Sequence, residues 1–381
     1  MKKIVFLALF LCILFYGYGK SLKIARDKTF LKNGPANYYD NVLVLKIGTE
    51  VTYIEDAKDD PDWINVSVGD KKGFISKMAL KESTGGKQDK FADLEGDGGK
   101  DVKNSIAPAS YTAAIKGFAL NYSQKKGYST TNIDQIFDLT NFSPKEINKT
   151  RKEFGLAYFP KKGELIGLKD TFINENLSAL GLCASMGVLQ QGVVTDAELT
   201  KKMNIIANIL ARQTVDYDSR YYVFIIKDPE PVAFSGPGGY IFVSDTLLRL
   251  ITEYKELVAI LGHEIGHVAL RHGIIDMAID QARASMQEAF DELDTMLDDE
   301  TFAISQDLEN VIKQGVEACK LVRDDKEEFE ADAVSIELLR RYKIDKSYLI
   351  NALNKVTNAL ASKYPDYKSQ TIRRVTKLSG K

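Results

Sequence analysis

All three histidines of this 381-residue chain lie within ten residues of one another, at His263, His267 and His272. The first two form a His-Glu-x-x-His motif inside an apolar run that predicts a buried helix. Positions four apart on a helix differ by only ~40° around its axis, so His263 and His267 point at one ion. Glu264 lies at the edge of the same face, where it can reach a metal-bound water without being a ligand. The chain must therefore adopt a fold that buries a metal-binding helix.

His272 does not fit the same helical face. It lies five residues past His267, or ~140° round the axis if the helix continues, and would then point away from the ion. We expect it to lie behind the ligands or at the surface. Because no histidine remains, the third ligand has to be a carboxylate.

A second acidic helix supplies candidates for that carboxylate. Glu328 and Asp332 are four residues apart, hence on one helical face. Glu328 is the expected third ligand, and Asp332 is expected to accept a hydrogen bond from a ligating imidazole, which fixes its tautomer and orientation. Glu327 and Glu330 point elsewhere and are expected to face solvent.

Composition excludes several function classes. The 51 basic and 53 acidic residues give a net charge of −2, so no basic field is available for nucleic acid. The length fits two or three soluble domains. Three cysteines are too few for a disulfide-dense module or a structural zinc finger, and the sequence leaves open whether Cys183 and Cys319 pair.

The first 19 residues have the pattern of a signal peptide. Lys2 and Lys3 precede an apolar run over 4–16, which is followed by Gly17-Tyr18-Gly19 as a small-x-small cleavage site. That run is shorter than the ~20 residues that a membrane span needs. We expect an exported protein, periplasmic or extracellular and envelope-associated, whose mature chain has no transmembrane segment.

Residues 20–83 predict a small all-β barrel of about five strands, because short apolar runs alternate with turn-rich pieces. Four motifs in this order resemble a bacterial SH3-like domain: Leu31-Lys32-Asn33-Gly34-Pro35, Ile47-Gly48-Thr49-Glu50-Val51, Trp63-Ile64-Asn65-Val66 and Gly73-Phe74-Ile75-Ser76. The resemblance implies cell-wall peptide or glycan as a partner of residues 21–83. A spacer that packs on the next domain is the alternative, with Trp63 as a core or groove aromatic.

The rest of the chain divides into three parts. Residues 84–104 are glycine-rich and charged, as in a flexible linker. Residues 105–170 form a helical connecting segment, in which Ser143 to Glu146 is a capping box and Gly155 ends the helix. Residues 171–381 are predicted to be mainly helical around a short β segment at 221–226. The expected fold class is α+β and multidomain.

Three motifs within 171–381 together resemble the HtpX-like and CAAX-prenyl-protease zinc metallopeptidases, which are gluzincins of clan MA, family 48. They are Ala233-Phe234-Ser235-Gly236-Pro237-Gly238-Gly239-Tyr240-Ile241-Phe242-Val243, His263-Glu264-Ile265-Gly266-His267 and Glu328-Phe329-Glu330-Ala331-Asp332. The resemblance implies a zincin-type domain with a small sheet and one Zn²⁺ per chain. It implies His263, His267 and Glu328 as the ligands and Glu264 as the general base.

The same resemblance implies an edge strand that receives an extended peptide. The residues expected there follow a Pro-Gly turn and are Gly239, Tyr240, Ile241, Phe242 and Val243. Near the C-terminus the family pattern has His-Pro and then Arg-Ile, where this chain has Tyr364-Pro365 and Arg374-Val375. Tyr364 and Arg374 are therefore the candidates for stabilising the transition state. Helix packing and a surface charge are the alternatives.

These expectations combine into a function. We expect an exported zinc metalloendopeptidase that cleaves extended or misfolded envelope proteins, in protein quality control, with Glu264 activating the zinc-bound water. One alternative is a non-catalytic, chaperone-like binding protein that keeps the zinc fold. Another is a cell-wall-associated factor that acts through the SH3-like domain. The sequence leaves the natural substrate, endo- against exo-cleavage and the oligomeric state open.

Overall fold

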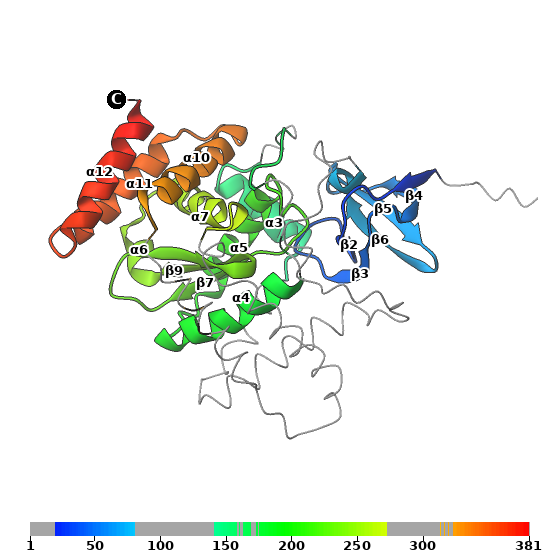
Figure 1. Cartoon of the computed structure of the whole chain (residues 1–381), viewed down its shortest axis with the longest axis horizontal. Coiled ribbons are helices and arrows are strands. Elements are labelled where there is room, and N and C mark those ends of the chain that lie inside the picture. Colours follow the sequence, from blue (N-terminus) through cyan, green and yellow to red (C-terminus); the bar gives the residue numbers. More distant parts are fainter. Residues whose placement is uncertain are drawn as a thin grey trace, which may run out of the picture.

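The computed structural model describes residues 20–80, 141–157, 163–168, 175–272 and 323–380, with isolated residues between them (Figure 1). The expected signal peptide at 1–19, the expected linker at 84–104 and most of the expected connecting segment lie outside the described residues. None of the described helices combines the length and the apolar character needed to cross a membrane.

The N-terminal part is a six-stranded antiparallel sheet, as the sequence predicts for a small all-β domain. The strand order is β1-β4-β5-β6-β2-β3. Trp63 is only 1% exposed, so it does not line a surface groove. The strands are β1 (Ser21–Lys23), β2 (Thr29–Lys32), β3 (Asn41–Leu45), β4 (Glu50–Asp56), β5 (Trp63–Val68) and β6 (Lys71–Ser76), followed by the 3₁₀ turn η1 (Lys77–Leu80).

The second part is mainly helical with a small sheet, which confirms the expected fold class. Its helices are α3 (Pro144–Glu153), α4 (Glu175–Val188), α5 (Ala197–Ala211), α6 (Asp245–Leu250), α7 (Tyr254–Ala269), α10 (Asp325–Arg341), α11 (Ser347–Leu360) and α12 (Pro365–Ser379). The 3₁₀ turns η3 (Leu189–Gln191) and η4 (Pro237–Gly239) lie between them. The predicted capping box is confirmed, because Ser143 and Glu146 cap each other's backbone at the start of α3.

The small sheet has three strands in the order β7-β9-β8, made of β7 (Tyr222–Ile226), β8 (Ala233–Gly236) and β9 (Tyr240–Ser244). β9 is parallel to β7 and antiparallel to β8, so it is the central strand. The prediction that residues 240–243 form an edge strand is therefore wrong, and Gly239 lies in η4 before the strand begins. All five residues of β9 are buried, as its continuous apolar run requires of a strand covered on both faces.

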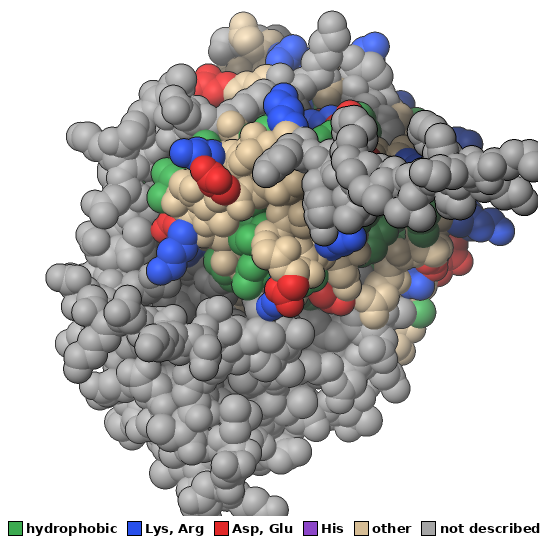
Figure 2. Space-filling view, turned by 90° about the vertical axis from the view of Figure 1, so that its right-hand side faces the viewer, with side chains coloured by type: hydrophobic (Ala, Val, Ile, Leu, Met, Phe, Trp, Pro, Cys, Tyr) green, Lys and Arg blue, Asp and Glu red, His purple; other side chains and the backbone are tan. Residues whose placement is uncertain are grey.

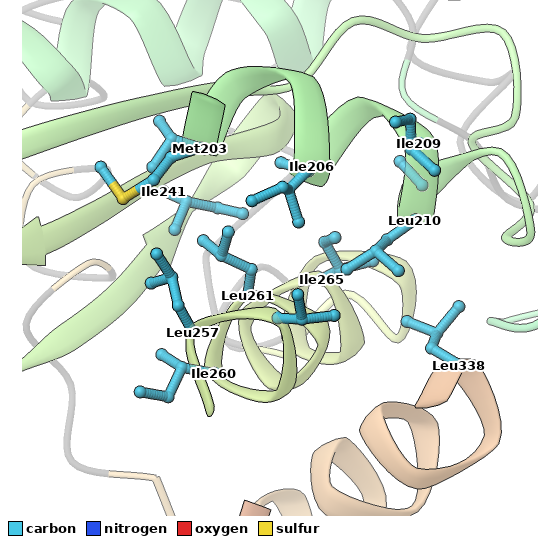
Figure 3. Close-up of a cluster of buried hydrophobic side chains, with 14 of the residues drawn as sticks. Met203, Ile206, Ile209, Leu210, Ile241, Leu257, Ile260, Leu261, Ile265 and Leu338 are labelled. Atoms are coloured by element: carbon cyan, nitrogen blue, oxygen red, sulfur yellow. The ribbon is translucent and has the colours of Figure 1, made fainter. Parts of the chain in front are cut away.

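The core of the second part surrounds α7. Figure 3 shows apolar side chains of α7 meeting those of α5, β9 and α10, among them Leu261, Ile265, Ile206, Ile241 and Leu338. α7 and α10 approach closely because α7 has a glycine at the contact. A Cβ on Gly266 would lie 3.0 Å from the backbone of Ala331. This close packing places the acidic start of α10 beside the histidines of α7.

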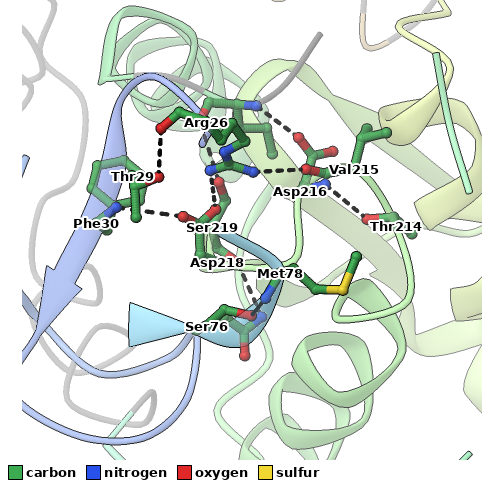
Figure 4. A network of polar contacts seen from close by, with 12 residues as sticks. Arg26, Thr29, Phe30, Ser76, Met78, Thr214, Val215, Asp216, Asp218 and Ser219 are labelled. Atoms are coloured by element: carbon green, nitrogen blue, oxygen red, sulfur yellow. Dashed lines mark hydrogen bonds and ion pairs between the residues drawn. The ribbon is translucent and has the colours of Figure 1, made fainter. Parts of the chain in front are cut away.

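The two parts share a buried polar interface, at the segment between α5 and β7 (Figure 4). Arg26 of the β domain contacts Asp218 at 2.5 Å and donates to the Val215 carbonyl at 3.1 Å. Arg212 forms a buried ion pair with Asp60 at 2.6 Å. The β domain therefore packs on the helical domain, as in the spacer alternative. The charged side chains that join the two parts are largely shielded from solvent.

Candidate metal centre and active site

Three predicted ligand side chains converge where α7 meets α10. The Nε2 atoms of His263 and His267 lie 3.0 Å apart. The carboxylate of Glu328 reaches both rings, with Oε2 at 3.4 Å from His263 Nε2 and Oε1 at 3.6 Å from His267 Nε2. Among the described residues, this is the group of His, Cys, Asp and Glu side chains that could hold a metal ion. Both rings are buried. Figure 2 views the molecule from the side of the β domain.

The geometry fits a zinc ion. Ligand atoms about 2.0–2.1 Å from a tetrahedral zinc lie roughly 3.3 Å from one another. The three separations here, 3.0, 3.4 and 3.6 Å, surround that value. Two ring nitrogens facing each other at 3.0 Å need either a hydrogen or a metal ion between them, because two lone pairs would repel. Two imidazoles and one carboxylate are the donor set that zinc takes in hydrolytic sites.

Asp332 lies directly behind His263, as the helical spacing predicts. Its Oδ1 is 3.0 Å from His263 Nδ1, and its side chain is fully buried. A carboxylate only accepts hydrogen bonds, so Nδ1 carries the proton in the neutral ring and Nε2 presents its lone pair to the metal position. The arrangement fixes both the tautomer and the orientation of this ring.

Arg374 joins the two carboxylates of α10 from α12. Its guanidinium contacts Glu328 at 2.5 Å and Asp332 at 2.6 and 2.8 Å. Only 3% of the residue is exposed, so the alternative that Arg374 is a surface charge is wrong. These ion pairs raise the pKa of Arg374 above its ordinary value even though burial opposes its charge.

Glu264 faces a neighbouring strand. It is buried, and this burial raises the pKa of Glu264, while the charge of His263 and a hydrogen bond from Ser235 lower it. Ser235 lies on β8, which packs against α7. In the sequence, Ser235 is one residue of the longer motif over 233–243. No local signal distinguishes it from its neighbours, because the contact depends on how β8 packs on α7.

His272 lies directly behind His267, which is one of the two positions expected for it. α7 ends at Ala269, so the assumption of a continuing helix does not hold. His272 Nδ1 lies 2.9 Å from His267 Nδ1, and His272 Nε2 lies 3.2 Å from Glu330 Oε2. Glu330 is exposed as expected but is not purely solvated.

The two tyrosines at the start of α12 differ in their surroundings. Tyr364, the sequence-based candidate, is 39% exposed, and its hydroxyl donates to Glu230. Tyr367 lies instead close enough to the ligand set to interact with its charges. Burial raises the pKa of Tyr367, the charge of Arg374 lowers this pKa, and the charges of Glu328 and Asp332 raise it further. Its spacing to Arg374 is seven residues, two helical turns, and this signal was available in the sequence.

Comparison with known proteins identifies the domain that holds this site. The family model described as peptidase family M48 matches residues 195–379. Residues 195–379 belong to peptidase family M48. The M48 domain runs from α5 to the end of α12, so it contains all of the clustered residues described above, whereas the β domain at 20–80 lies outside it.

Individual relatives match parts of the chain. Metalloprotease YcaL of Escherichia coli (strain K12) is 26% identical over 170 residues, 45% of this chain and 63% of the relative. Metalloprotease LoiP of the same organism is 36% identical over 77 residues, 20% of this chain and 29% of the relative. The beta-barrel assembly-enhancing protease of Yersinia pestis is 28% identical over 80 residues, 21% of this chain and 16% of the relative. The chain thus spans less than two thirds of each of these relatives.

Proposed function

We propose that this protein is a zinc-dependent endopeptidase that cleaves extended or misfolded polypeptides. The observation that carries the proposal is the convergence of His263, His267 and Glu328 within an M48 domain, with Glu264 buried on the same helix. The similarity to family M48 supports peptide hydrolysis as the reaction, and the side-chain geometry supports these residues as the ones that carry it out.

His263, His267 and Glu328 would hold the zinc ion, leaving one position open for water and substrate. A zinc ion held there supplies a Lewis acid that polarises the scissile carbonyl and lowers the pKa of water. The charges of the site balance when it is filled. The zinc ion and Arg374 contribute three positive charges, and Glu264, Glu328 and Asp332 contribute three negative ones. A balanced set of charges is the arrangement in which buried ionic groups are stable.

Glu264 is the general base in this mechanism. Its carboxylate takes a proton from the attacking water and delivers it to the nitrogen of the leaving amine. Burial raises the pKa of Glu264 and so makes the carboxylate a stronger base, while Ser235 holds it in place with a hydrogen bond. Glu264 therefore receives and returns one proton in each turnover.

Tyr367, rather than Tyr364, is the candidate for stabilising the transition state. Burial and the nearby carboxylates raise the pKa of Tyr367, which keeps its phenol protonated at neutral pH. A protonated phenol can donate a hydrogen bond to the oxyanion that develops on the scissile carbonyl. Arg374 is occupied by Asp332 and Glu328, so it balances charge rather than contacting substrate.

The substrate strand would add to β8 instead of β9. Within the part of the chain that the structure describes, β8 pairs with β9 on one side and with no strand on the other. An extended peptide can hydrogen-bond to such a free edge. Because Ser235 of β8 contacts Glu264, a peptide running along this strand would have its backbone near the general base. Most strands of a folded protein are already paired on both sides, which favours unfolded segments as substrates.

The site of action is the cell envelope in this proposal. The N-terminal pattern at 1–19 predicts export. The Yersinia pestis relative is a beta-barrel assembly-enhancing protease, and its name supports a place in the envelope. We therefore propose misfolded exported proteins as the substrate class and quality control as the role.

The test is hydrolysis of a fully unfolded polypeptide by the purified mature protein. A chelator should abolish cleavage, and added zinc should restore it. Mass spectrometry should find fragments cut within the chain, because endopeptidase activity does not proceed residue by residue from an end. Loss of single residues from one terminus would make the enzyme an exopeptidase. An unfolded substrate left intact by fully zinc-loaded protein would refute peptidase activity.

A further inference from the structure

A sharp turn follows the metal-binding helix. α7 ends at Ala269, and Arg271 has a left-handed backbone with φ 62°. A side chain with a Cβ rarely adopts this conformation, because the Cβ approaches the following carbonyl. The turn allows the next residue to come back over the helix, where its backbone N–H donates to the His267 carbonyl at 3.0 Å.

A buried ion pair holds this strained residue. The guanidinium of Arg271 is fully buried and contacts both oxygens of Asp216, at 2.7 and 2.9 Å. Asp216 is itself fixed, because it accepts hydrogen bonds from the Tyr221 hydroxyl at 3.0 Å and from the Ile173 backbone at 2.7 Å. Two-point pairing between fixed partners determines the position of a guanidinium closely. The turn is thus clamped to the segment between α5 and β7.

The clamped turn places His272 against His267. Their Nδ1 atoms lie 2.9 Å apart, while His267 Nε2 faces His263 and Glu328. If Nε2 is to present a lone pair to a metal, Nδ1 of His267 must carry the proton and donate it. His272 Nδ1 is then the acceptor, and His272 Nε2 carries a proton that it donates to Glu330 at 3.2 Å.

We propose that His272 is a positioning residue that fixes the tautomer and ring orientation of His267, and that the Arg271–Asp216 pair holds it in place. The proposal rests on the proposed function to the extent that His267 is a metal ligand. It gives each ligating imidazole its own acceptor: Asp332 for His263 and His272 for His267. Such outer partners set metal affinity without touching the ion.

The test compares two substitutions in the full-length mature protein, His272→Ala and His272→Gln. The alanine removes the acceptor, whereas the glutamine amide oxygen can replace it. Zinc affinity, measured by competition with a chromogenic chelator, should fall by roughly 10–100-fold in His272→Ala and recover most of this loss in His272→Gln. Circular dichroism and thermal unfolding of both variants check that the fold is retained.

A second measurement uses the wild-type protein and does not depend on any variant folding. Nitrogen-15 imidazole spectra of the zinc-loaded form should show His267 protonated at Nδ1 and His272 protonated at Nε2. Equal zinc affinity in wild type and His272→Ala, or a His272 ring protonated at Nδ1, would overturn the proposal. If His272→Ala loses zinc but wild type cleaves no peptide, the positioning role stands and the peptidase function fails.

Discussion

Arg374 of α12 holds Asp332 of α10 by two contacts, Nη2 to Oδ1 at 2.6 Å and Nε to Oδ2 at 2.8 Å. The same guanidinium contacts Glu328 at 2.5 Å. One cation therefore bridges Glu328, a predicted metal ligand, and Asp332, the residue behind the ligand His263. All three side chains are largely shielded from solvent. The C-terminal helix is therefore part of the metal site, although it supplies none of the three ligand atoms.

Removing the charge of Arg374 should destabilise the protein strongly. The Arg374→Met variant leaves Glu328 and Asp332 with protonated His263 as their cation and removes the guanidinium that they share, and breaking a buried pair in this way costs about 3–5 kcal/mol. Urea unfolding of the metal-free protein measures this loss. Zinc should restore part of the stability, because the ion supplies the missing positive charge.

The neighbouring Arg373 provides a matched control. It pairs with Asp325 at the surface, with its side chain 53% exposed. An exposed pair of this kind contributes little to stability, so Arg373→Met should unfold close to wild type. An equal loss of unfolding free energy in Arg373→Met and Arg374→Met would contradict the prediction. It would mean that any substitution in this part of α12 destabilises the protein, whether or not the charge is buried.

The hydrogen bond from Ser235 should set the acid limit of activity. Glu264 has to be ionised to act as a base, so activity falls as pH drops through its pKa. Burial raises this pKa, and the Ser235 hydrogen bond opposes the rise by favouring the ionised form. Ser235→Ala should therefore move the acid limb of the kcat/KM profile to higher pH. A limb that stays in place, or moves to lower pH, contradicts the contact.

Two tyrosine substitutions distinguish the candidates for oxyanion stabilisation. Tyr367→Phe should lower kcat by roughly 10²–10³-fold with little change in KM, as expected when one oxyanion donor is lost. Tyr364→Phe should have little effect, because its hydroxyl is directed to Glu230. Steady-state kinetics on one fluorogenic peptide measure both. The reverse result would assign oxyanion stabilisation to Tyr364.

Zinc binding should release about one proton near neutral pH. Burial lowers the pKa of His263, but hydrogen bonds to Asp332 and Glu328 outweigh it and raise the pKa to about 10 in the metal-free protein. The ring is therefore protonated at pH 7, and the metal has to displace that proton. Calorimetric titrations in buffers of different ionisation enthalpy count the protons. Zinc affinity should rise by about tenfold per pH unit below that pKa; a binding constant that is independent of pH would contradict the assignment.

The parts of the site that could be predicted from sequence depend on local spacing. Helical periodicity placed His263 beside His267 and Glu328 beside Asp332, because residues four apart share a helix face whatever the tertiary fold. The apolar context of the motif correctly indicated a buried helix.

The predictions that were wrong depend on long-range arrangement. Whether β9 is central or at an edge follows from where β8 and β7 pair, which the run of residues in β9 does not encode. His272 lies behind a ligand as expected, but the assumption that the helix continues to it was wrong. Arginine is a common helix residue, and the left-handed turn at Arg271 is stabilised by Asp216, 55 residues earlier in the chain. The role of Arg374 likewise depends on a partner 42 residues away.

The Glu264→Gln variant tests the central claim most directly. Zinc content and peptide turnover are measured on the same preparations of wild type and variant. Glu264 is not among the ligand atoms, and glutamine keeps its size, so zinc occupancy should remain at about one per chain. Turnover should fall by at least ~10²–10⁴-fold, the contribution of a positioned general base. Equal turnover by the two zinc-loaded proteins would contradict the assignment of Glu264 as the base and, with it, the proposed peptidase mechanism.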